Sequence, residues 1–376
     1  MPPPQADRLV PAIAQDWLAA EAGSEAVTVE LSRLLPTAPI HTTFFDPQIF
    51  GGAIEPARVH TWPLQRVPAA RSRFRSLLPL YPIWFSLLDL RAHPLVISSS
   101  VAFTHAVRTS PRALHVSYVY TPLRYAWDLD TYLDRSSWSF PARIGARILR
   151  PLLRRWDLAT ASRPDVVLGI SQEVARRIKR IWGRDAEVIY PPVDVDAIPV
   201  STRDEGFLLV AARLLAYRRI NLAVAAANQL ERELIVVGDG PERRRLEAMA
   251  GPNVRFLGRV DRATLIDLFG RCHAYLVPGI EDFGIAPVEA MAAGKPVVGI
   301  NAGGVAETVI EGKTGVLFAN QTVDDLAAAI ERLDNLTIDP AVCRARAEGF
   351  SVAVFHARWR DLFVRLGVDP SLYSPP

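Results

Sequence analysis

The sequence predicts an α/β protein built from parallel sheets in two domains. Short apolar runs alternate with helical stretches along the chain, which is typical of parallel strands covered by helices on both faces. The 376 residues, 49% hydrophobic and 22% charged, are enough for two domains with full cores. Ligands of such sheets bind beyond the carboxyl ends of the strands, so the functional residues are expected there.

The second half shows this alternation most clearly. We expect Asp261 to cap one helix at its N-terminus and Gly294 to close another at its C-terminus. The predicted strands are 206–214, 232–241, 253–260, 273–279 and 295–301, and the predicted helices are 221–230, 242–250, 261–272 and 286–294.

The first half follows the same pattern less regularly. Pro11 lies inside the first strand candidate, where it would remove a ladder donor. The proline-bearing stretch 188–199 has no periodicity and is predicted to be a linker. A helical pattern returns at 351–366. The strand candidates are 9–17, 94–100, 113–122 and 165–171, and 25–36 is a predicted helix.

Charge is distributed unevenly. Residues 58–184 contain 21 Lys/Arg and 7 Asp/Glu, a net charge of +14, so the rest of the chain carries −11. A basic half suits phosphates, an anionic membrane face or nucleic acid, although a solvated arginine-rich surface is the plain alternative. The basic half lacks helix-turn-helix, RNP-like and zinc signatures, which argues against nucleic acid.

Two glutamates, Glu281 and Glu289, lie eight positions apart in "GIEDFGIAPVEAMAAGKPVV", which runs from the end of a predicted strand into a predicted helix. Backbone N–H groups at the N-terminus of that helix would bind anions or hydroxyls. A carboxylate accepts two hydrogen bonds from a vicinal diol, so the pair suits a sugar and a ribose. The alternative is that neither residue binds a ligand, with Glu281 in a solvated loop and Glu289 on a helix face.

Basic side chains follow other strands. Arg213, Arg218 and Arg219 come after the strand run "GFLLVA", where a cationic fork can neutralise a diphosphate. A surface basic patch is the alternative. His115 lies mid-strand in an apolar setting, and a histidine of this kind is commonly a core residue. No histidine has the partner spacing of a metal site.

Together these features resemble the retaining glycosyltransferases of family 4, which have the GT-B architecture. "EDFGIAPVE" matches the E-x7-E motif of that family at Glu281 and Glu289, and "GDGPE", "FLGRV", "GGVAETV" and "GKTGVLF" fall in the family's order. "HVSYVYTPLRYAWD" and "VIYPPVD" resemble the branch that often uses GDP-mannose or a related GDP-sugar. "EAGSEAV" resembles the N-terminal loop near the diphosphate, with Ala22 in place of its first glycine.

The resemblance implies two Rossmann-like domains facing across a cleft, with the C-terminal helix crossing back to the first domain. Residues 1–193 with 352–376 would bind the acceptor, and residues 200–350 would bind the nucleotide-sugar. Arg218 stands where the family usually has lysine, which keeps the charge and changes the geometry. The implied catalytic residues are His115, Glu281, Arg213 and Arg218, and the implied donor-binding residues are Gly23, Gly258, Arg259, Val260, Phe283, Gly284, Ile285 and Glu289.

The implied activity is that of a retaining hexosyltransferase. Its best donor is GDP-mannose, and its acceptor is a glycan or lipid-linked glycan of cell-surface polysaccharide or glycolipid synthesis. Arginines would replace a metal, so no metal or cofactor is expected. The aspartates at 128–130 and 194–196 are accordingly interpreted not as metal ligands but as a helix start and a linker. A UDP-sugar donor, a nucleotide-sugar epimerase and a non-catalytic nucleotide-sugar-binding protein are the alternatives.

A membrane partner is also expected from the basic first half, because lipid-linked acceptors carry phosphate. In "ARSRFRSLLPLYPIWFSLL" three arginines precede apolar and aromatic residues, a pattern that can lie in a membrane interface. A core helix is the alternative. We expect a cytoplasmic protein, with peripheral attachment to the anionic inner membrane face left open. The residues of this pattern are Arg71, Arg73, Arg75, Leu77, Leu78, Trp84 and Phe85.

Overall fold

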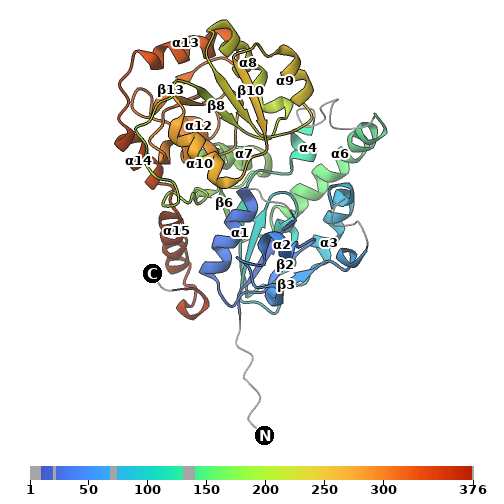
Figure 1. Ribbon diagram of the computed structural model, residues 1–376. Coiled ribbons are helices and arrows are strands. Elements are labelled where there is room, and N and C mark those ends of the chain that lie inside the picture. Colours follow the sequence, from blue (N-terminus) through green and yellow to red (C-terminus); the bar gives the residue numbers. More distant parts are fainter. Residues whose placement is uncertain (1–9, 20–22, 68–73, 130–139, 375–376) are drawn as a thin grey trace. The chain divides into compact units, whose positions relative to one another are not determined.

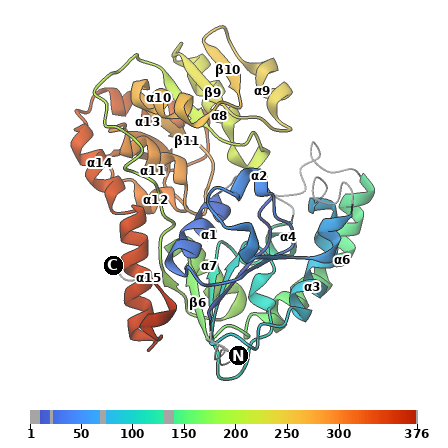
Figure 2. The same ribbon diagram turned by 60° about the horizontal axis from the view of Figure 1, so that its bottom comes forward.

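The computed structural model describes residues 10–19, 23–67, 74–129 and 140–374, and Figures 1 and 2 show it from two sides. The chain forms two compact units. The first contains the described residues up to Leu129, then Gly145–Tyr190, and the chain from Phe355 onward. The second contains Pro191–Val354. Each unit has its own sheet, so the predicted α/β class with two domains is confirmed.

The sheet of the first unit is parallel throughout. Its strand order is β3-β2-β1-β4-β5-β6-β7, so the order along the chain reverses between β1 and β4. Pro11 lies just before β1 rather than inside it, and no ladder donor is lost. The strands are β1 (Ala12–Gln15), β2 (Ile40–Thr42), β3 (Val59–Thr61), β4 (Leu95–Ser100), β5 (Leu114–Val119), β6 (Val166–Gly169) and β7 (Glu187–Val188).

Helices pack on this sheet and bury its apolar side chains. α7 begins after Ser171, whose side chain accepts from the Val174 N–H, and ends at Gly183 in the left-handed region. The helices that belong wholly or mostly to the first unit are α1 (Gly23–Leu34), α2 (Pro47–Phe50), α3 (Tyr81–Leu87), α4 (Arg124–Trp127), α6 (Phe140–Thr160), α7 (Gln172–Trp182) and α15 (Val352–Arg365). Short 3-10 turns are η1 (Pro56–Arg58), η2 (Pro63–Arg66), η3 (Phe74–Leu80), η4 (Thr104–Ala106) and η6 (Pro370–Leu372).

The C-terminal helix α15 belongs to the core of the first unit. The ring of Trp359, fully buried, lies 5.8 Å from the ring of Tyr118 in β5, and Phe355 packs 6.2 Å from the same tyrosine. The predicted return of the C-terminal helix to the first domain is therefore confirmed.

The segment expected to lie in a membrane interface turns its aromatic side chains inward. Phe85 is fully buried and Leu78 nearly so, and Trp84 stacks on Trp62 with ring centres 5.4 Å apart. These residues belong to an aromatic core with Tyr81 and Phe103, so the core alternative holds for them. Arg71 and Arg73, with the side chain of Arg75, lie outside the described residues.

The second unit has a six-stranded parallel sheet in the order β10-β9-β8-β11-β12-β13. The strands are β8 (Leu208–Ala211), β9 (Leu234–Val237), β10 (Val254–Gly258), β11 (Ala274–Val277), β12 (Val297–Ile300) and β13 (Gly315–Phe318). The helices are α8 (Ile220–Gln229), α9 (Arg243–Met249), α10 (Arg262–Arg271), α11 (Ile285–Ala292), α12 (Val305–Thr308), α13 (Val323–Asp334) and α14 (Pro340–Glu348), and η5 (Ala216–Arg218) precedes α8.

Both predicted caps are present in the second unit. The Asp261 side chain accepts from the Thr264 N–H at 2.7 Å at the start of α10. Beyond α11, Gly294 has a φ of 81°, and the Lys295 N–H reaches back to the Ala290 carbonyl at 2.9 Å. The stretch predicted as a linker begins in β7 of the first unit and continues into the second, where the Val193 N–H donates to the Phe350 carbonyl.

Candidate donor site of the second unit

The strand order of the second unit reverses between β8 and β11, which pair side by side. Loops that leave two such strands diverge to opposite sides, and ligands of open parallel sheets bind at this switch point. Arg213 and Arg218 follow β8, and Glu281 follows β11. The fold therefore brings these three predicted residues to the same edge of one sheet.

Arg218 and Glu281 form an ion pair between their Nη1 and Oε1 atoms. Their side chains are only 25% and 18% exposed, so this is not a solvated surface patch. Burial acts to lower the pKa of Arg218, but Glu281 and then Tyr217 raise it more, and the net pKa is raised. The buried Nε of Arg218 has no hydrogen-bond partner among the described residues. A buried cation with an unused N–H is suited to an additional anion.

The backbone around this pair is closely packed. A side chain on Gly279 would place its Cβ 2.6 Å from the Arg218 carbonyl oxygen, so only glycine fits between the two loops. The Gly304 N–H donates to the Glu281 carbonyl at 2.8 Å and holds the loop from its other side. Glu281 is thus fixed by main-chain contacts as well as by Arg218.

The N-terminus of α11 lies directly after Glu281 along the chain. Gly284, with a φ of 89°, precedes the helix and offers no side-chain cap, so the first-turn N–H groups at Ile285 and beyond have no cap from that residue. Phe283 is 3% exposed and packs 5.6 Å from the ring of Phe350. Its side chain belongs to the core, and any contribution it makes to a ligand comes from its backbone.

Glu289 lies one turn further into α11 and pairs with a residue that the sequence did not indicate. Its Oε1 lies 2.7 Å from Arg262 Nη1, in the first turn of α10, and its side chain is 12% exposed. Burial raises the pKa of Glu289, whereas Arg262 opposes that rise. The two glutamates therefore have different arginine partners. No spacing in the sequence relates Arg262 to Glu289, because the contact depends on how α10 packs on α11.

The remaining predicted donor residues lie at the same edge of the sheet. Gly258 ends β10, two strands from β8, and its carbonyl accepts from the Gly238 N–H at 2.7 Å. Arg259 is exposed and Val260 half-buried. Arg213 is exposed and makes no ion pair with the described residues. These positions leave Arg213 and Arg259 open to a ligand.

His115, in the first unit, does not lie at the sheet edge where ligands bind. It is the second residue of β5, at the amino end of the strand, and is fully buried. Its Nε2 lies 2.9 Å from the Ser98 hydroxyl. Burial first, and then Arg163, lower its pKa to about 3. This environment is that of a core histidine, the alternative interpretation of its sequence setting.

The carboxyl edge of the first sheet carries polar residues that the sequence analysis missed. Tyr120 directly follows β5, and its hydroxyl lies 3.1 Å from both the Ser99 hydroxyl and the Ser24 carbonyl. Gly23 begins α1 beside Ser24, whereas Ala22 lies outside the described residues. Tyr120 lies inside the predicted strand run 113–122, so no sequence signal indicated that it follows the end of the strand.

Asp16 lies at the reversal point of the first sheet, one residue after β1, and is fully buried. Its carboxylate accepts from the N–H groups of Val101, Ala102 and Phe103 at 2.8, 3.0 and 2.8 Å. Burial still raises its pKa to about 7, although these three hydrogen bonds lower it. Asp16 therefore joins the loop after β4 to the end of β1.

The aspartates of 128–130 and 194–196, where the structure describes them, are not placed to hold a metal ion. Asp128 follows α4 as its C-cap, Asp130 lies outside the described residues, and Asp194 and Asp196 are exposed. Within residues 10–19, 23–67, 74–129 and 140–374, no group of three His, Cys, Asp or Glu side chains is placed to hold a metal ion. Over the same residues, no helix is both long and apolar enough to cross a bilayer.

Comparison with known proteins agrees with this fold. Residues 22–197 match Glycosyltransferase Family 4, and residues 196–349 match Glycosyl transferases group 1. The two adjoining matches, together with the fold likeness, support a group 1 glycosyltransferase of the GT-B fold. The residues that match group 1 include Arg213, Arg218, Glu281 and Glu289, so the candidate donor site lies within the matched range. The predicted GT-B fold is confirmed.

Individual relatives cover parts of the chain. Glycogen synthase of Mycobacterium tuberculosis is 36% identical over 151 residues, 37% of this chain and 36% of that protein. Alpha-1,3/1,6-mannosyltransferase ALG2 of Dictyostelium discoideum is 48% identical over 68 residues, 18% of this chain and 16% of that protein. The chain thus spans about a third or less of the length of these two relatives. The crystal structure of Anabaena HepE in complex with UDP has a TM-score of 0.67 at 17% identity, covering 95% of this chain and all of that one.

Proposed function

We propose that this glycosyltransferase moves a sugar from a nucleotide-sugar to a glycan or lipid-linked acceptor. The Arg218–Glu281 pair at the switch point of the second sheet supports the proposal most directly. It combines a cation for the diphosphate with a carboxylate for sugar hydroxyls at the edge where such sheets bind ligands. Glu289, in the same helix region, would accept from the ribose diol.

GDP-mannose is the proposed donor, and a UDP-sugar is the alternative. The sequence likeness to a mannosyltransferase over 68 residues supports mannose. The fold likeness to a protein crystallised with UDP keeps the UDP-sugar as the second candidate. Gly258, Arg259 and Val260 would flank the base at the end of β10.

The proposed reaction is a transfer with retained configuration and without a metal. The bond from the anomeric carbon to the diphosphate oxygen breaks, and a bond from that carbon to the acceptor oxygen forms on the same face. Arg213 and Arg218 stabilise the charge that develops on the diphosphate. The acceptor hydroxyl proton passes to an oxygen of the departing diphosphate. Glu281 and the amides around Phe283, Gly284 and Ile285 orient the sugar.

Release of GDP from GDP-mannose, with and without a mannosyl-lipid acceptor, tests this function. We expect release to require the acceptor, to persist in EDTA, and to be lost in Glu281→Ala but kept in Glu311→Ala, whose carboxylate pairs with Arg332 at the surface. Sugar epimerisation without acceptor would instead identify an epimerase. Donor binding without turnover on any acceptor would favour the non-catalytic alternative. Loss of activity in EDTA would overturn the metal-independent mechanism.

Peripheral association with an anionic membrane face belongs to the same proposal, because a lipid-linked acceptor lies at such a face. The excess of arginine in residues 58–184 supports it. Cytoplasmic placement at the inner face of the membrane would bring the acceptor and a soluble nucleotide-sugar to the same enzyme.

A further inference from the structure

Two helices of the first unit expose large apolar side chains. Ile83 and Leu87 of α3 are 59% and 58% exposed, and Ile148 and Leu152 of α6 are 71% and 63% exposed. Each pair is spaced by four residues and therefore lies on one side of its helix. We call these four residues the α3–α6 face. Side chains of this size and exposure, gathered on neighbouring helices, mark interaction surfaces.

The two helices are in direct contact. Figures 1 and 2 both show α3 and α6 side by side. The Trp156 indole N–H of α6 donates to the Ser86 hydroxyl of α3 at 2.9 Å. Leu152 precedes Trp156 by four residues and Ile83 precedes Ser86 by three, so the exposed side chains border this contact. Leu153 and Trp84 pack against the aromatic core, whereas the α3–α6 face stays exposed.

The charges around the α3–α6 face are positive. Arg147 and Arg155 of α6 are exposed, and α3 carries no charged residue. The acid in α6, Asp157, is fully buried and accepts from the indole N–H groups of Trp127 and Trp182 at 2.7 and 2.8 Å. The solvent side of these helices is therefore both apolar and basic, as in helices that lie in a lipid interface.

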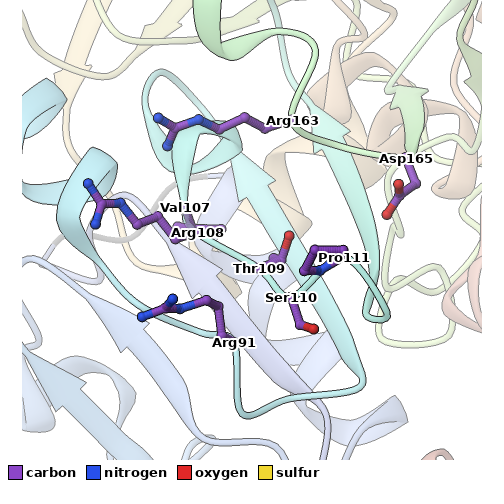
Figure 3. Close-up of a pocket in the computed structure, with 8 residues that line it drawn as sticks. All are labelled: Arg91, Val107, Arg108, Thr109, Ser110, Pro111, Arg163 and Asp165. Atoms are coloured by element: carbon purple, nitrogen blue, oxygen red, sulfur yellow. The ribbon is translucent and has the colours of Figure 1, made fainter.

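Both helices end near a pocket lined by arginines. Arg163 lies three residues after α6, Arg91 lies four after α3, and the Arg108 N–H donates to the carbonyl of Leu88, the residue that follows α3. The pocket has a volume of about 440 Å³. Figure 3 shows the three guanidinium groups on one side of it and Asp165 on the other. We call Arg91, Arg108 and Arg163 the arginine cluster.

The acids near the arginine cluster are already engaged. Asp89 binds the Arg91 guanidinium through two hydrogen bonds to Oδ1 and Oδ2, at 2.9 and 2.6 Å. Asp165 accepts from the His115 backbone N–H at 2.8 Å. Arg108 makes no ion pair within the described chain, and burial together with the charge of Arg108 lowers the pKa of Arg163. An incoming phosphate would relieve this repulsion.

We propose that the α3–α6 face docks on an anionic lipid bilayer and that the arginine cluster binds the phosphate of a lipid headgroup beside it. The apolar side chains enter the interface, and the arginines remain at headgroup level. A second copy of the chain is a poorer occupant, because Arg147 and Arg155 would meet like charges. The inference rests on the proposed membrane partner, but it is independent of the donor and the transfer chemistry.

Vesicle binding by the full-length protein tests the proposal. Wild type is expected to sediment with phosphatidylglycerol-containing vesicles at low salt and to be released at high salt. Ile148→Glu/Leu152→Glu should weaken binding by at least about tenfold, since two buried apolar side chains are replaced by repelled charges. Arg108→Ala should weaken it by roughly fivefold, the contribution of one arginine at an anionic surface.

Matched variants separate docking from general effects. Val364→Glu alters an equally exposed apolar residue, 68% exposed on α15, and Arg358→Ala removes an exposed arginine of the same helix. Both should bind vesicles like wild type. The α6 double variant should keep wild-type thermal stability and nucleotide-induced stabilisation. Its loss of vesicle binding can then be distinguished from a defect of the donor site. Equal binding to pure phosphatidylcholine, equal loss in the α15 variants, or no vesicle binding by wild type would overturn the proposal.

Discussion

Arg218 Nη1 contacts Glu281 Oε1, and this contact links the loop after β8 to the loop after β11 at the point where the strand order of the second sheet reverses. The pair connects the residue proposed to stabilise the leaving diphosphate to the residue proposed to bind the sugar. Each charge compensates the other at a place that is largely shielded from solvent.

Removing the charge of Arg218 should impair turnover more than replacing the arginine by lysine. Arg218→Ala is expected to lower kcat by roughly a hundredfold or more, since it removes a donor aimed at developing charge. Arg218→Lys should recover much of that loss because the charge persists, although the fork geometry does not. Steady-state kinetics with the donor would compare the two. Equal losses in both variants would contradict a charge-stabilising role.

Arg262 should control the protonation of Glu289. Arg262 opposes the effect of burial on that carboxyl, so Arg262→Ala raises the pKa of Glu289 further. A protonated carboxyl accepts fewer hydrogen bonds from a ribose diol. Nucleotide affinity in Arg262→Ala should therefore fall more steeply than in wild type as pH is lowered, which titration calorimetry at several pH values would measure. Arg255→Ala, whose partner is the exposed Glu233, is the control, and an unchanged pH profile in Arg262→Ala would argue against the coupling.

His115 should affect stability rather than catalysis. Its folded-state pKa, about 3, lies below the ordinary value of 6.5, so between these values the unfolded chain binds a proton that the folded chain does not. Stability is therefore lost as pH falls from about 6.5 toward 3, by at most about 1.4 kcal/mol per pH unit for this one group. His115→Gln should flatten the acid side of the pH–Tm curve and leave nucleotide affinity unchanged at pH 7.5. A large loss of nucleotide affinity would restore His115 to the donor site.

Gly279→Ala should disturb the site while the fold persists. The added Cβ would meet the Arg218 backbone carbonyl at 2.6 Å, so the loop carrying Arg218 must move. We expect a destabilisation of about 1–3 kcal/mol, as for other overpacked positions, together with loss of nucleotide binding. Gly52→Ala, where a Cβ meets nothing within 4 Å, should be neutral. Normal nucleotide binding by a folded Gly279→Ala protein would show that the Arg218 loop position is not critical.

Local pattern was enough for much of the second unit. Short apolar runs distinguished the strands β8 to β12 from the helices between them. The order of these elements therefore predicted that Arg218 and Glu281 follow the carboxyl ends of two strands. Contacts that depend on tertiary packing could not be predicted from the sequence. The Glu289–Arg262 pair depends on how α10 lies against α11, and the inward turn of Phe85 depends on the aromatic core around Tyr81.

His115 shows a second limit of sequence reasoning. An apolar strand run containing a polar residue does not reveal which end of the strand that residue occupies. His115 falls at the amino end of β5, whereas Tyr120 falls just past the carboxyl end. Position along the strand, rather than residue type, decides which of the two can reach a ligand.

Thermal stabilisation by a panel of GDP, UDP, ADP and their sugars tests the central claim most directly, with Glu289→Ala measured beside wild type. A nucleotide at a hundred times its Kd stabilises the folded state by roughly 2.7 kcal/mol, a readily measured shift in Tm. We expect a shift with GDP and GDP-mannose that is lost in Glu289→Ala. A shift with UDP alone would replace the donor, and the absence of a shift with every nucleotide would contradict the donor site at the ends of β8 and β11.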